Sequence, residues 1–292
     1  MQKLLTNACI MKMGIIGPAE RTSVWEQRVR PIQSVSEVIT TERAAYLGSV
    51  DACIFLDESK NKYEKLLGLI REGIHVFAII PLNIESEMAL RLFRSAEESR
   101  VQVQFAHWAT FTSLTEWMTE QIPNPRSLYF SRILPRSVFL GYQTGFDHLW
   151  LEDIALCLSW ISSEVHRIET IPVRHAGEEL ALHLHIRFDN GATGTIFINT
   201  LGSEVRHERM ASDYKMSIQA NVLKNHVRIA HVTAEERLAV EQKKVEQREP
   251  ASTALLRFIK SIQMRLDPPF SVYHLLRLSR TLEGIQAQLA RY

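Results

Sequence analysis

Four short apolar runs, separated by stretches of helical character, restrict the fold more than any other feature of this sequence. They lie at 12–17, 51–56, 75–80 and 101–107. The stretches between them carry apolar residues at helical spacing, as in 61–73, where Gly73 ends the pattern. Strands that alternate with helices of this length form right-handed crossovers. We therefore predict a parallel, doubly wound sheet that is covered by helices on both faces.

The remaining stretches of this first part are assigned in the same way. Residues 85–100 have the pattern of an amphipathic helix. Between the first two apolar runs we expect about two helical turns at 22–30, a short strand at 30–38 and a helix at 40–48 that Gly48 closes.

From residue 127 the pattern changes, and its strongest signal is LALHLHIRF-DNG-ATGTIFINT, which begins at Leu180. Apolar and polar residues alternate strictly on both sides of Asn190-Gly191, which predicts a hairpin. Other extended segments are expected at 127–135, 166–176, 214–220 and 226–232, with helices at 145–163, 253–266 and 271–290. The charged run 235–249 reads as a solvated face or a mobile connection. The second part is thus predicted to be an α+β domain with an open, mostly antiparallel sheet and helices on one face.

Length and composition limit the class of protein. A chain of 292 residues is long for one core, so we divide it into two domains, 1–115 and 116–292. A formal net charge of +1 gives no reason to expect nucleic acid or an acidic membrane as partner. Cys9, Cys53 and Cys157 form no C-x-x-C pair, so we expect buried, reduced thiols in a cytoplasmic protein.

The order of these elements resembles the Gfo/Idh/MocA family, named after glucose–fructose oxidoreductase and inositol dehydrogenase. The likeness spreads over nearly the whole chain and rests on GIIG at 14–17, the position of Pro81, FDNGATGTI at 188–196 and the closing pattern through 271–290. It implies a Rossmann-like dinucleotide-binding domain that holds NAD or NADP. It also implies a C-terminal domain whose sheet builds the substrate site for a sugar or cyclitol and usually an oligomer interface.

The phosphate loop departs from the family pattern. Where the family has G-x-G-x-x-[GA], this chain has Gly17-Pro18-Ala19-Glu20-Arg21-Thr22. Pro18 removes one N–H donor, and Glu20 places a negative charge where phosphate would lie, which Arg21 can offset. Glu37 stands where an acidic residue could meet a ribose hydroxyl. If a dinucleotide binds, we expect contacts from Gly17, Pro18, Ala19, Arg21, Glu37 and Pro81.

The acid–base residues of the family are also replaced. Its Glu-Lys-Pro after a strand reads Ile79-Ile80-Pro81, and its helix start D-x-G-x-H-x-x-D has no counterpart within 145–161. His107, at the end of a strand, and the pair Asp147-His148 are substitute candidates. For Asp147 a role as the N-cap of its helix is the simpler interpretation.

Two further histidines are candidate metal ligands. His183 and His185 share one face of a strand, but no carboxylate or thiol stands at a matching spacing, so we predict no metal site. A polar or interfacial sheet face explains the pair more simply, and together with Thr195 and Phe197 it is the expected homo-oligomer face.

Two functions stay open at this point. The first is a protein with the oxidoreductase fold that lacks dehydrogenase chemistry and acts in binding, regulation or assembly, with an active paralogue as a further partner. The second is an NAD(P)-dependent oxidoreductase acting on a sugar- or cyclitol-like substrate with a relocated acid–base residue. An enzyme of another class has no motif in its favour.

Overall fold

The chain folds into two compact units, which are described in turn. The computed structural model describes residues 10–141, 145–233 and 235–292. The first unit comprises the chain through Trp108 together with Ala251–Ser279, and the second comprises Ala109–Pro250 with Arg280–Tyr292. The domain boundary after residue 115 stays a prediction from the sequence.

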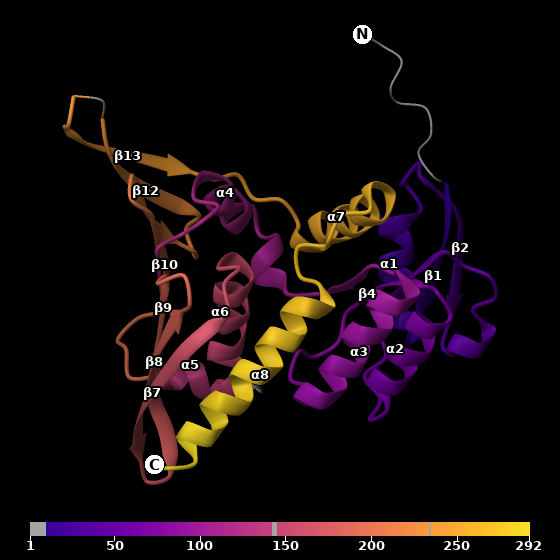
Figure 1. Ribbon diagram of the computed structural model, residues 1–292, viewed down its shortest axis with the longest axis horizontal. Coiled ribbons are helices and arrows are strands. Elements are labelled where there is room, and N and C mark those ends of the chain that lie inside the picture. Colours follow the sequence, from indigo (N-terminus) through magenta and orange to yellow (C-terminus); the bar gives the residue numbers. More distant parts are fainter. Residues whose placement is uncertain (1–9, 142–144, 234) are drawn as a thin grey trace. The chain divides into compact units, whose positions relative to one another are not determined.

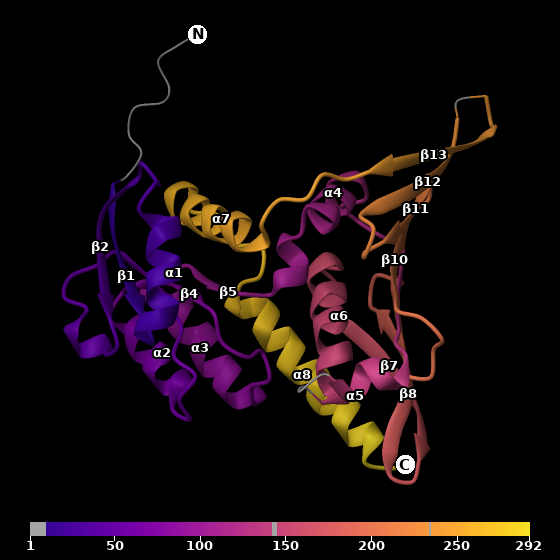
Figure 2. The ribbon, with the colours of Figure 1, turned by 180° about the vertical axis from the view of Figure 1, so that it is seen from behind.

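The first unit is built on a five-stranded parallel sheet in the order β2-β1-β3-β4-β5 (Figures 1 and 2). The strands are β1 (Met11–Ile16), β2 (Val35–Thr41), β3 (Ala52–Phe55), β4 (His75–Ala78) and β5 (Val103–Phe105). Every residue of β3 is buried, as expected for a parallel strand covered on both faces. The predicted doubly wound sheet is confirmed.

Helices cover this sheet on both faces. They are α1 (Ala19–Val29), α2 (Lys62–Arg71), α3 (Ser86–Ser99), α7 (Pro250–Met264) and the first part of α8 (Val272–Leu289). Phe77 of β4 touches Trp25 of α1 and Phe258 of α7, so these two helices share a face. The right-handed crossovers place α2 and α3, which lie side by side, on the other (Figure 1).

The helix predicted at 40–48 is wrong. Strand β2 continues to Thr41, and only Ala44–Tyr46 form a short 3₁₀ turn, η1. The cause is pairing with β1, because the N–H of Gly17 still donates to the carbonyl of Thr41 at 3.0 Å. The β-branched run 38–41 suits a strand better than a helix.

The second unit contains an eight-stranded sheet in the order β13-β12-β11-β10-β6-β9-β8-β7. Its strands are β6 (Ser127–Ile133), β7 (Val165–His175), β8 (Glu178–Phe188), β9 (Thr193–Asn199), β10 (Arg206–Ser212), β11 (Met216–Asn221), β12 (His226–Val232) and β13 (Leu238–Lys244). Strands β6 and β9 pair in parallel, and the other neighbours pair antiparallel. The open, mostly antiparallel sheet and its hairpin at Asn190-Gly191 are confirmed.

The charged run 235–249 is more than a connection. It contains β13, an exposed edge strand of the sheet. Charged side chains on an edge strand discourage further pairing, which explains how a strand can be so polar. Strand β10 was not foreseen, because its sequence RHERMAS has few apolar residues.

Helices α4 (Ser113–Gln121), α5 (Arg136–Gly141) and α6 (Phe146–Trp160) lie on one side of this sheet (Figures 1 and 2). Helix α6 packs closely on β9, since a Cβ on Gly194 would lie 2.3 Å from the Sγ of Cys157. Cys53 and Cys157 are buried, as predicted, and are not joined by a disulfide, whereas Cys9 lies outside the described residues.

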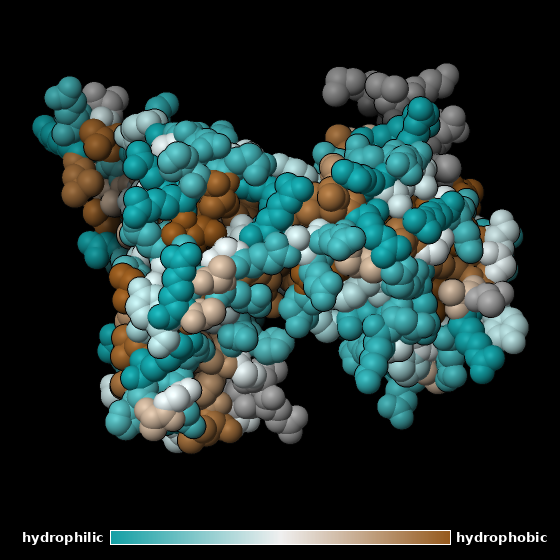
Figure 3. All heavy atoms as spheres, turned by 60° about the horizontal axis from the view of Figure 1, so that its bottom comes forward, coloured by the Kyte–Doolittle hydropathy of each residue, from teal (hydrophilic) through white to brown (hydrophobic). Residues whose placement is uncertain are grey.

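The face in Figure 3 is mostly hydrophilic, with apolar side chains in separate groups. Among the described residues, no helix has the length and apolar character needed to cross a membrane.

Candidate functional site

The carboxyl edge of the five-stranded sheet is the candidate site. The chain moves from β1 outward to β2 and then returns to the other side of β1 with β3, so the strand order reverses there. Ligands of doubly wound folds bind at such a switch point, outside the carboxyl ends of the strands. The segments that meet at this edge follow Ile16, Thr41, Phe55, Ala78 and Phe105.

Gly17 allows the loop after β1 and the loop after β3 to pack closely together. Its φ is +155°, and a Cβ at this position would lie 2.6 Å from the Cβ of Leu56. The N–H of Leu56 in turn donates to the carbonyl of Ile16 at 2.8 Å. A glycine is therefore required here for close packing of the loops after β1 and β3, whether or not a phosphate approaches.

The start of α1 offers few donors to an anion. Pro18 occupies the N-cap position and has no N–H. The N–H groups of Arg21 and Thr22 already donate to the carbonyl of Pro18 at 3.0 Å. The backbone donors left in the first turn are those of Ala19 and Glu20, and the side chain of Glu20 adds a negative charge beside them.

Arg21 spans the switch point. Its Nη1 donates to Oε1 of Glu58 and approaches the carbonyl of Leu56 at 3.5 Å. The guanidinium thus links α1 to the loop after β3, across the position where a diphosphate would lie. The sequence indicated Arg21 as an offset for Glu20, whereas its ion-pair partner is Glu58.

The loop that carries Glu58 is held by its own contacts. The N–H of Ser59 donates to Oδ1 of Asp57 at 2.7 Å, and Lys65 of α2 pairs with Oδ2. Partial burial alone would raise the pKa of Asp57, but the hydrogen bonds from Lys65 and Ser59 outweigh it and hold that pKa below its ordinary value. Asp57 is therefore an ionised anchor for the loop.

These features do not fit a dinucleotide diphosphate bound in the usual way. Pro18 deletes a donor, the acidic side chains of Glu20 and Glu58 flank the loop, and Arg21 is already paired. A diphosphate would have to displace Glu58 from Arg21 before it could use that cation.

Glu37 lies away from this edge. Cα pairing places Glu37 beside Lys12 and Thr41 beside Ile16, and Oε2 of Glu37 is 2.9 Å from Nζ of Lys12. The structure therefore does not bring Glu37 to Gly17. Thr41, followed by the exposed Glu42 and Arg43, stands at the strand end instead. Sequence reasoning missed these residues because it ended the strand at residue 38.

The end of β4 is apolar. Ile79 and Ile80 directly follow the strand and are 9% and 6% exposed. The hydroxyl of Tyr63 donates to the carbonyl of Pro81 at 2.7 Å, and burial raises the pKa of Tyr63 to about 12. The side chains that directly follow the strand, those of Ile79 and Ile80, can neither donate nor accept a proton.

His107 is packed into the first unit. It is 2% exposed, and its ring lies 4.8 Å from that of Phe270, centroid to centroid. Phe270 stacks with His274 on α8 at 5.6 Å. Burial, with the nearby Arg277 and His107, lowers the pKa of His274 to about 4. A substrate contact by His107 stays a prediction, and it would require this packing to open.

Asp147 and His148 lie at the start of α6 in the second unit, and both are exposed. The capping prediction for Asp147 is wrong, because Gly145 is the N-cap and Asp147 lies within the first turn. Partial burial and the charge of Glu179 raise the pKa of Asp147, although His148 opposes the shift.

A buried ionic cluster around Asp153 was not predicted. The carboxylate of Asp153, on α6, is fully buried, and Arg132 of β6 reaches its Oδ2 at 3.2 Å. His207 and Arg209 of β10 approach Oδ1 at 3.6 and 3.5 Å. Burial would raise the pKa of Asp153, but the charges of Arg132 and Arg209 and the contact with His207 hold it well below its ordinary value. The cluster joins α6 to the sheet.

The pair His183 and His185 shows no sign of a metal site. Among the described residues, no group of three or more His, Cys, Asp or Glu side chains is placed to hold a metal ion. His185 Nδ1 lies 3.1 Å from the hydroxyl of Thr195, and the ring of His183 meets that of Phe197 edge to face at 6.2 Å.

Comparison with known proteins gives a fold but no close relative. No family model matches the chain, and no curated protein matches it in sequence. Among solved structures, UDP-N-acetylglucosamine 3-dehydrogenase GnnA from Acidithiobacillus ferrooxidans has a TM-score of 0.77 at 14% identity, covering 95% of this chain and 96% of that one. An oxidoreductase from Agrobacterium radiobacter in complex with NAD+, L-tartaric acid and magnesium has a TM-score of 0.76 at 10% identity, covering 96% of each. An NAD-binding oxidoreductase from Klebsiella pneumoniae has a TM-score of 0.75 at 13% identity, covering 97% of each.

The fold is that of the Gfo/Idh/MocA-type oxidoreductases. The parallel five-stranded unit and the open eight-stranded unit match these oxidoreductases over nearly the whole of both chains. The resemblance predicted from the sequence is thereby confirmed at the level of the fold.

Proposed function

We propose that this protein uses the Gfo/Idh/MocA-type fold for binding or regulation and lacks the dehydrogenase chemistry that the family resemblance implies. Oxidation of an alcohol carbon requires the hydroxyl proton to leave as the hydride departs. A positioned acid–base group typically contributes about 10²–10⁴-fold to the rate of such a step. The protein then acts by holding a ligand or by assembling with a partner such as an active paralogue.

The apolar end of β4 carries this proposal. Ile80 occupies the position that the family resemblance assigns to a catalytic lysine, Ile79 that of the glutamate before it, and both are buried. An isoleucine side chain neither transfers a proton nor stabilises a developing alkoxide. The Arg21–Glu58 ion pair supports the proposal independently, because it weakens the site for a diphosphate.

Nucleotide binding and turnover test the proposal together. NADH and NADPH would be titrated by calorimetry, and absorbance at the reduced-nicotinamide band would be followed with NAD+ or NADP+ across a panel of polyols and sugars. We expect weak nucleotide binding and no turnover above a protein-free control. Micromolar binding of either nucleotide with turnover at ordinary enzyme rates would overturn it.

An active oxidoreductase with a relocated acid–base residue is the alternative. The exposed pair Asp147-His148 favours it, because the raised pKa of Asp147 is typical of a group poised for proton transfer. Such an enzyme would use NAD or NADP. Turnover that is lost in His148→Ala and kept in His166→Ala, a surface variant, would favour this alternative.

For the assembly we propose a homodimer formed through the open face of the eight-stranded sheet. The helices of the second unit lie on one side of the sheet (Figure 1), while His183, Phe197 and Ser131 lie in one cross-strand row on the other. Phe197, like Tyr129 and Met210 on the same face, is only half-buried in one chain. A second copy would cover these side chains.

The oligomeric state tests the assembly. Sedimentation velocity of the wild-type protein is expected to give a dimer, and Phe197→Asp should give a monomer. Leu223→Asp, at an exposed turn between β11 and β12, is the matched control and should stay dimeric. A wild-type protein that sediments only as a monomer at micromolar concentration would refute the dimer.

A further inference from the structure

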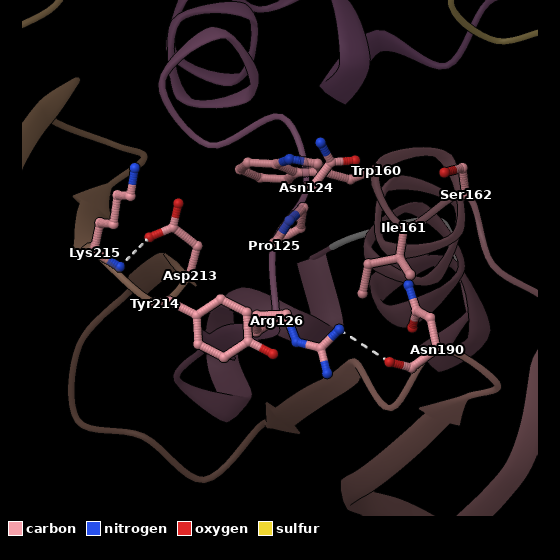
Figure 4. Close-up of a pocket in the computed structure, with 10 residues that line it drawn as sticks. All are labelled: Asn124, Pro125, Arg126, Trp160, Ile161, Ser162, Asn190, Asp213, Tyr214 and Lys215. Carbon is pink, nitrogen blue, oxygen red and sulfur yellow. Dashed lines mark hydrogen bonds between the residues drawn. The ribbon is translucent and has the colours of Figure 1, made fainter.

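A cavity of about 390 Å³ lies at one end of the central strands of the eight-stranded sheet, within the second unit (Figure 4). Three turns form it: the segment before β6, the turn between β8 and β9 at Asn190, and the turn between β10 and β11 at Tyr214. Trp160, the last residue of α6, lines it as well. The cavity is thus at the end of α6 that is remote from Asp147.

Arg126 is held in the cavity by its backbone. Its N–H donates to the carbonyl of Ser212 at 2.7 Å, and its own carbonyl accepts from the N–H of Thr193 at 3.0 Å. The residue is therefore fixed between the two strands that flank β6. Its side chain is half-buried and starts from a rigid base.

The guanidinium of Arg126 is oriented but not neutralised. Nη1 donates to the carbonyl of Asn190 at 2.9 Å, and the group lies over the ring of Tyr214, 5.3 Å from its centroid (Figure 4). No carboxylate among the described residues forms an ion pair with it. A guanidinium has five N–H donors, so this arrangement leaves a planar fork with donors available.

The other charged groups of the cavity leave its net charge positive. The carboxylate of Asp213 accepts the N–H groups of Lys215 and Met216 at 2.7 and 2.8 Å through the same oxygen, as a turn carboxylate does. The exposed Lys215 adds a second cation to the rim. The cavity therefore holds two cations and one carboxylate that is engaged with the backbone.

We propose that this cavity binds a small ligand carrying a carboxylate beside a flat apolar group. The guanidinium fork of Arg126 matches a carboxylate in a bidentate contact. The exposed ring of Tyr214 and the buried Trp160 supply aromatic surface for the apolar part. All residues of the site belong to the second unit and none to the five-stranded unit, so the proposal stands whether or not the protein is a dehydrogenase.

Benzoate is the probe, measured by saturation-transfer NMR and calorimetry on the full chain at constant ionic strength. Benzamide has the same shape without the charge, and phenyl phosphate replaces the carboxylate with a phosphate. We expect saturable binding of benzoate at millimolar concentration, and weaker binding of both other compounds. Absence of benzoate binding, equal binding of benzamide, or tighter binding of phenyl phosphate would each overturn the proposal.

Variants test the residues. Arg126→Gln should weaken benzoate at least about tenfold, as expected for a lost charge-assisted contact. Tyr214→Leu should weaken it too, whereas Tyr214→Phe keeps the aromatic face and should retain it. Arg228→Gln, an exposed residue of β12 outside the cavity, is the matched control. Binding that survives Arg126→Gln in a protein with an unchanged unfolding midpoint would show that Arg126 only clamps the turns.

Discussion

The guanidinium of Arg21, on α1, donates to the carboxylate of Glu58, in the loop after β3, and so closes the switch point of the five-stranded sheet with an internal ion pair. In a doubly wound fold this is the place where a ligand anion binds. In this protein the carboxylate of Glu58 already neutralises Arg21 there. The affinity for an external anion should therefore depend on Glu58.

Replacing Glu58 tests this dependence. Glu58→Gln keeps the size of the side chain and removes its charge, so Arg21 becomes available to a phosphate. An exposed ion pair is worth up to about 1 kcal/mol, or roughly a fivefold change in affinity. Calorimetry with ADP should show tighter binding by that factor, and Glu72→Gln, at the end of α2, should show no change. Equal affinities in wild type and Glu58→Gln would mean that the ion pair does not guard the site.

The cluster at Asp153 makes a prediction about stability. Asp153→Asn removes the buried anion and leaves Arg132, His207 and Arg209 facing one another. Breaking a buried ion pair by removing one partner costs about 3–5 kcal/mol. Urea unfolding should show a loss of this size for Asp153→Asn and a much smaller one for Glu152→Gln, whose carboxylate is partly exposed. Similar losses in both variants would contradict the burial argument.

The pKa of Asp153 adds a pH dependence. Because its pKa is lowered in the folded state, its contribution is complete above the ordinary value of 3.8 and is lost as the pH falls below that value. The difference in unfolding free energy between the wild type and Asp153→Asn should therefore shrink under acid conditions. A difference that is constant from neutral pH to pH 3 would be inconsistent with this linkage.

The sequence predicted the fold well because the fold rests on local patterns. Alternation in 180–188, a turn at Asn190-Gly191 and helical spacing in 61–73 each specify one element and its neighbours. The candidate site was predicted less well. The Arg21–Glu58 pair joins residues 37 positions apart, and their contact depends on how the loops after β1 and β3 meet.

Two misses have the same physical origin. The helix expected at 40–48 was an interpretation of local propensity, and pairing of β2 with β1 overrode it through Thr41. Strand β10 has almost no apolar alternation, because Arg209 is buried against Asp153 and Thr115 rather than exposed. Long-range pairing decided both, and single-sequence patterns carry little information about it.

Replacing two glycines by alanine should change the stability of the protein in opposite directions. Gly17→Ala adds a Cβ 2.6 Å from that of Leu56 at a φ that L-residues rarely adopt, which should cost about 1–3 kcal/mol. Gly68 lies inside α2, and a Cβ there meets nothing within 4 Å. Gly68→Ala should therefore stabilise the protein by up to about 1 kcal/mol. Thermal unfolding of both variants separates the cases, and a stabilised Gly17→Ala would refute the close-packing role.

The last prediction concerns His274. Its Nδ1 accepts the N–H of Ser271 at 3.1 Å, and its ring stacks on Phe270, so the folded protein holds it neutral. The pKa is lowered to about 4 from 6.5, chiefly by burial. A histidine with a lowered pKa contributes stability above its unfolded pKa, and this contribution is lost as the pH falls from 6.5 towards 4.

Unfolding free energies measured by urea between pH 7 and pH 4 test this. One proton of difference gives a slope of about 1.4 kcal/mol per pH unit. Burial also lowers the pKa of His75 and His207, so the wild type should lose stability steeply over this range. His274→Gln keeps a hydrogen-bond acceptor without a titrating ring, and it should be less stable at pH 7 but have a shallower slope. His231→Gln, at a half-exposed position of β12, is the control and should keep the wild-type slope. A wild-type slope in His274→Gln would mean that the His274 ring does not contribute to the pH dependence.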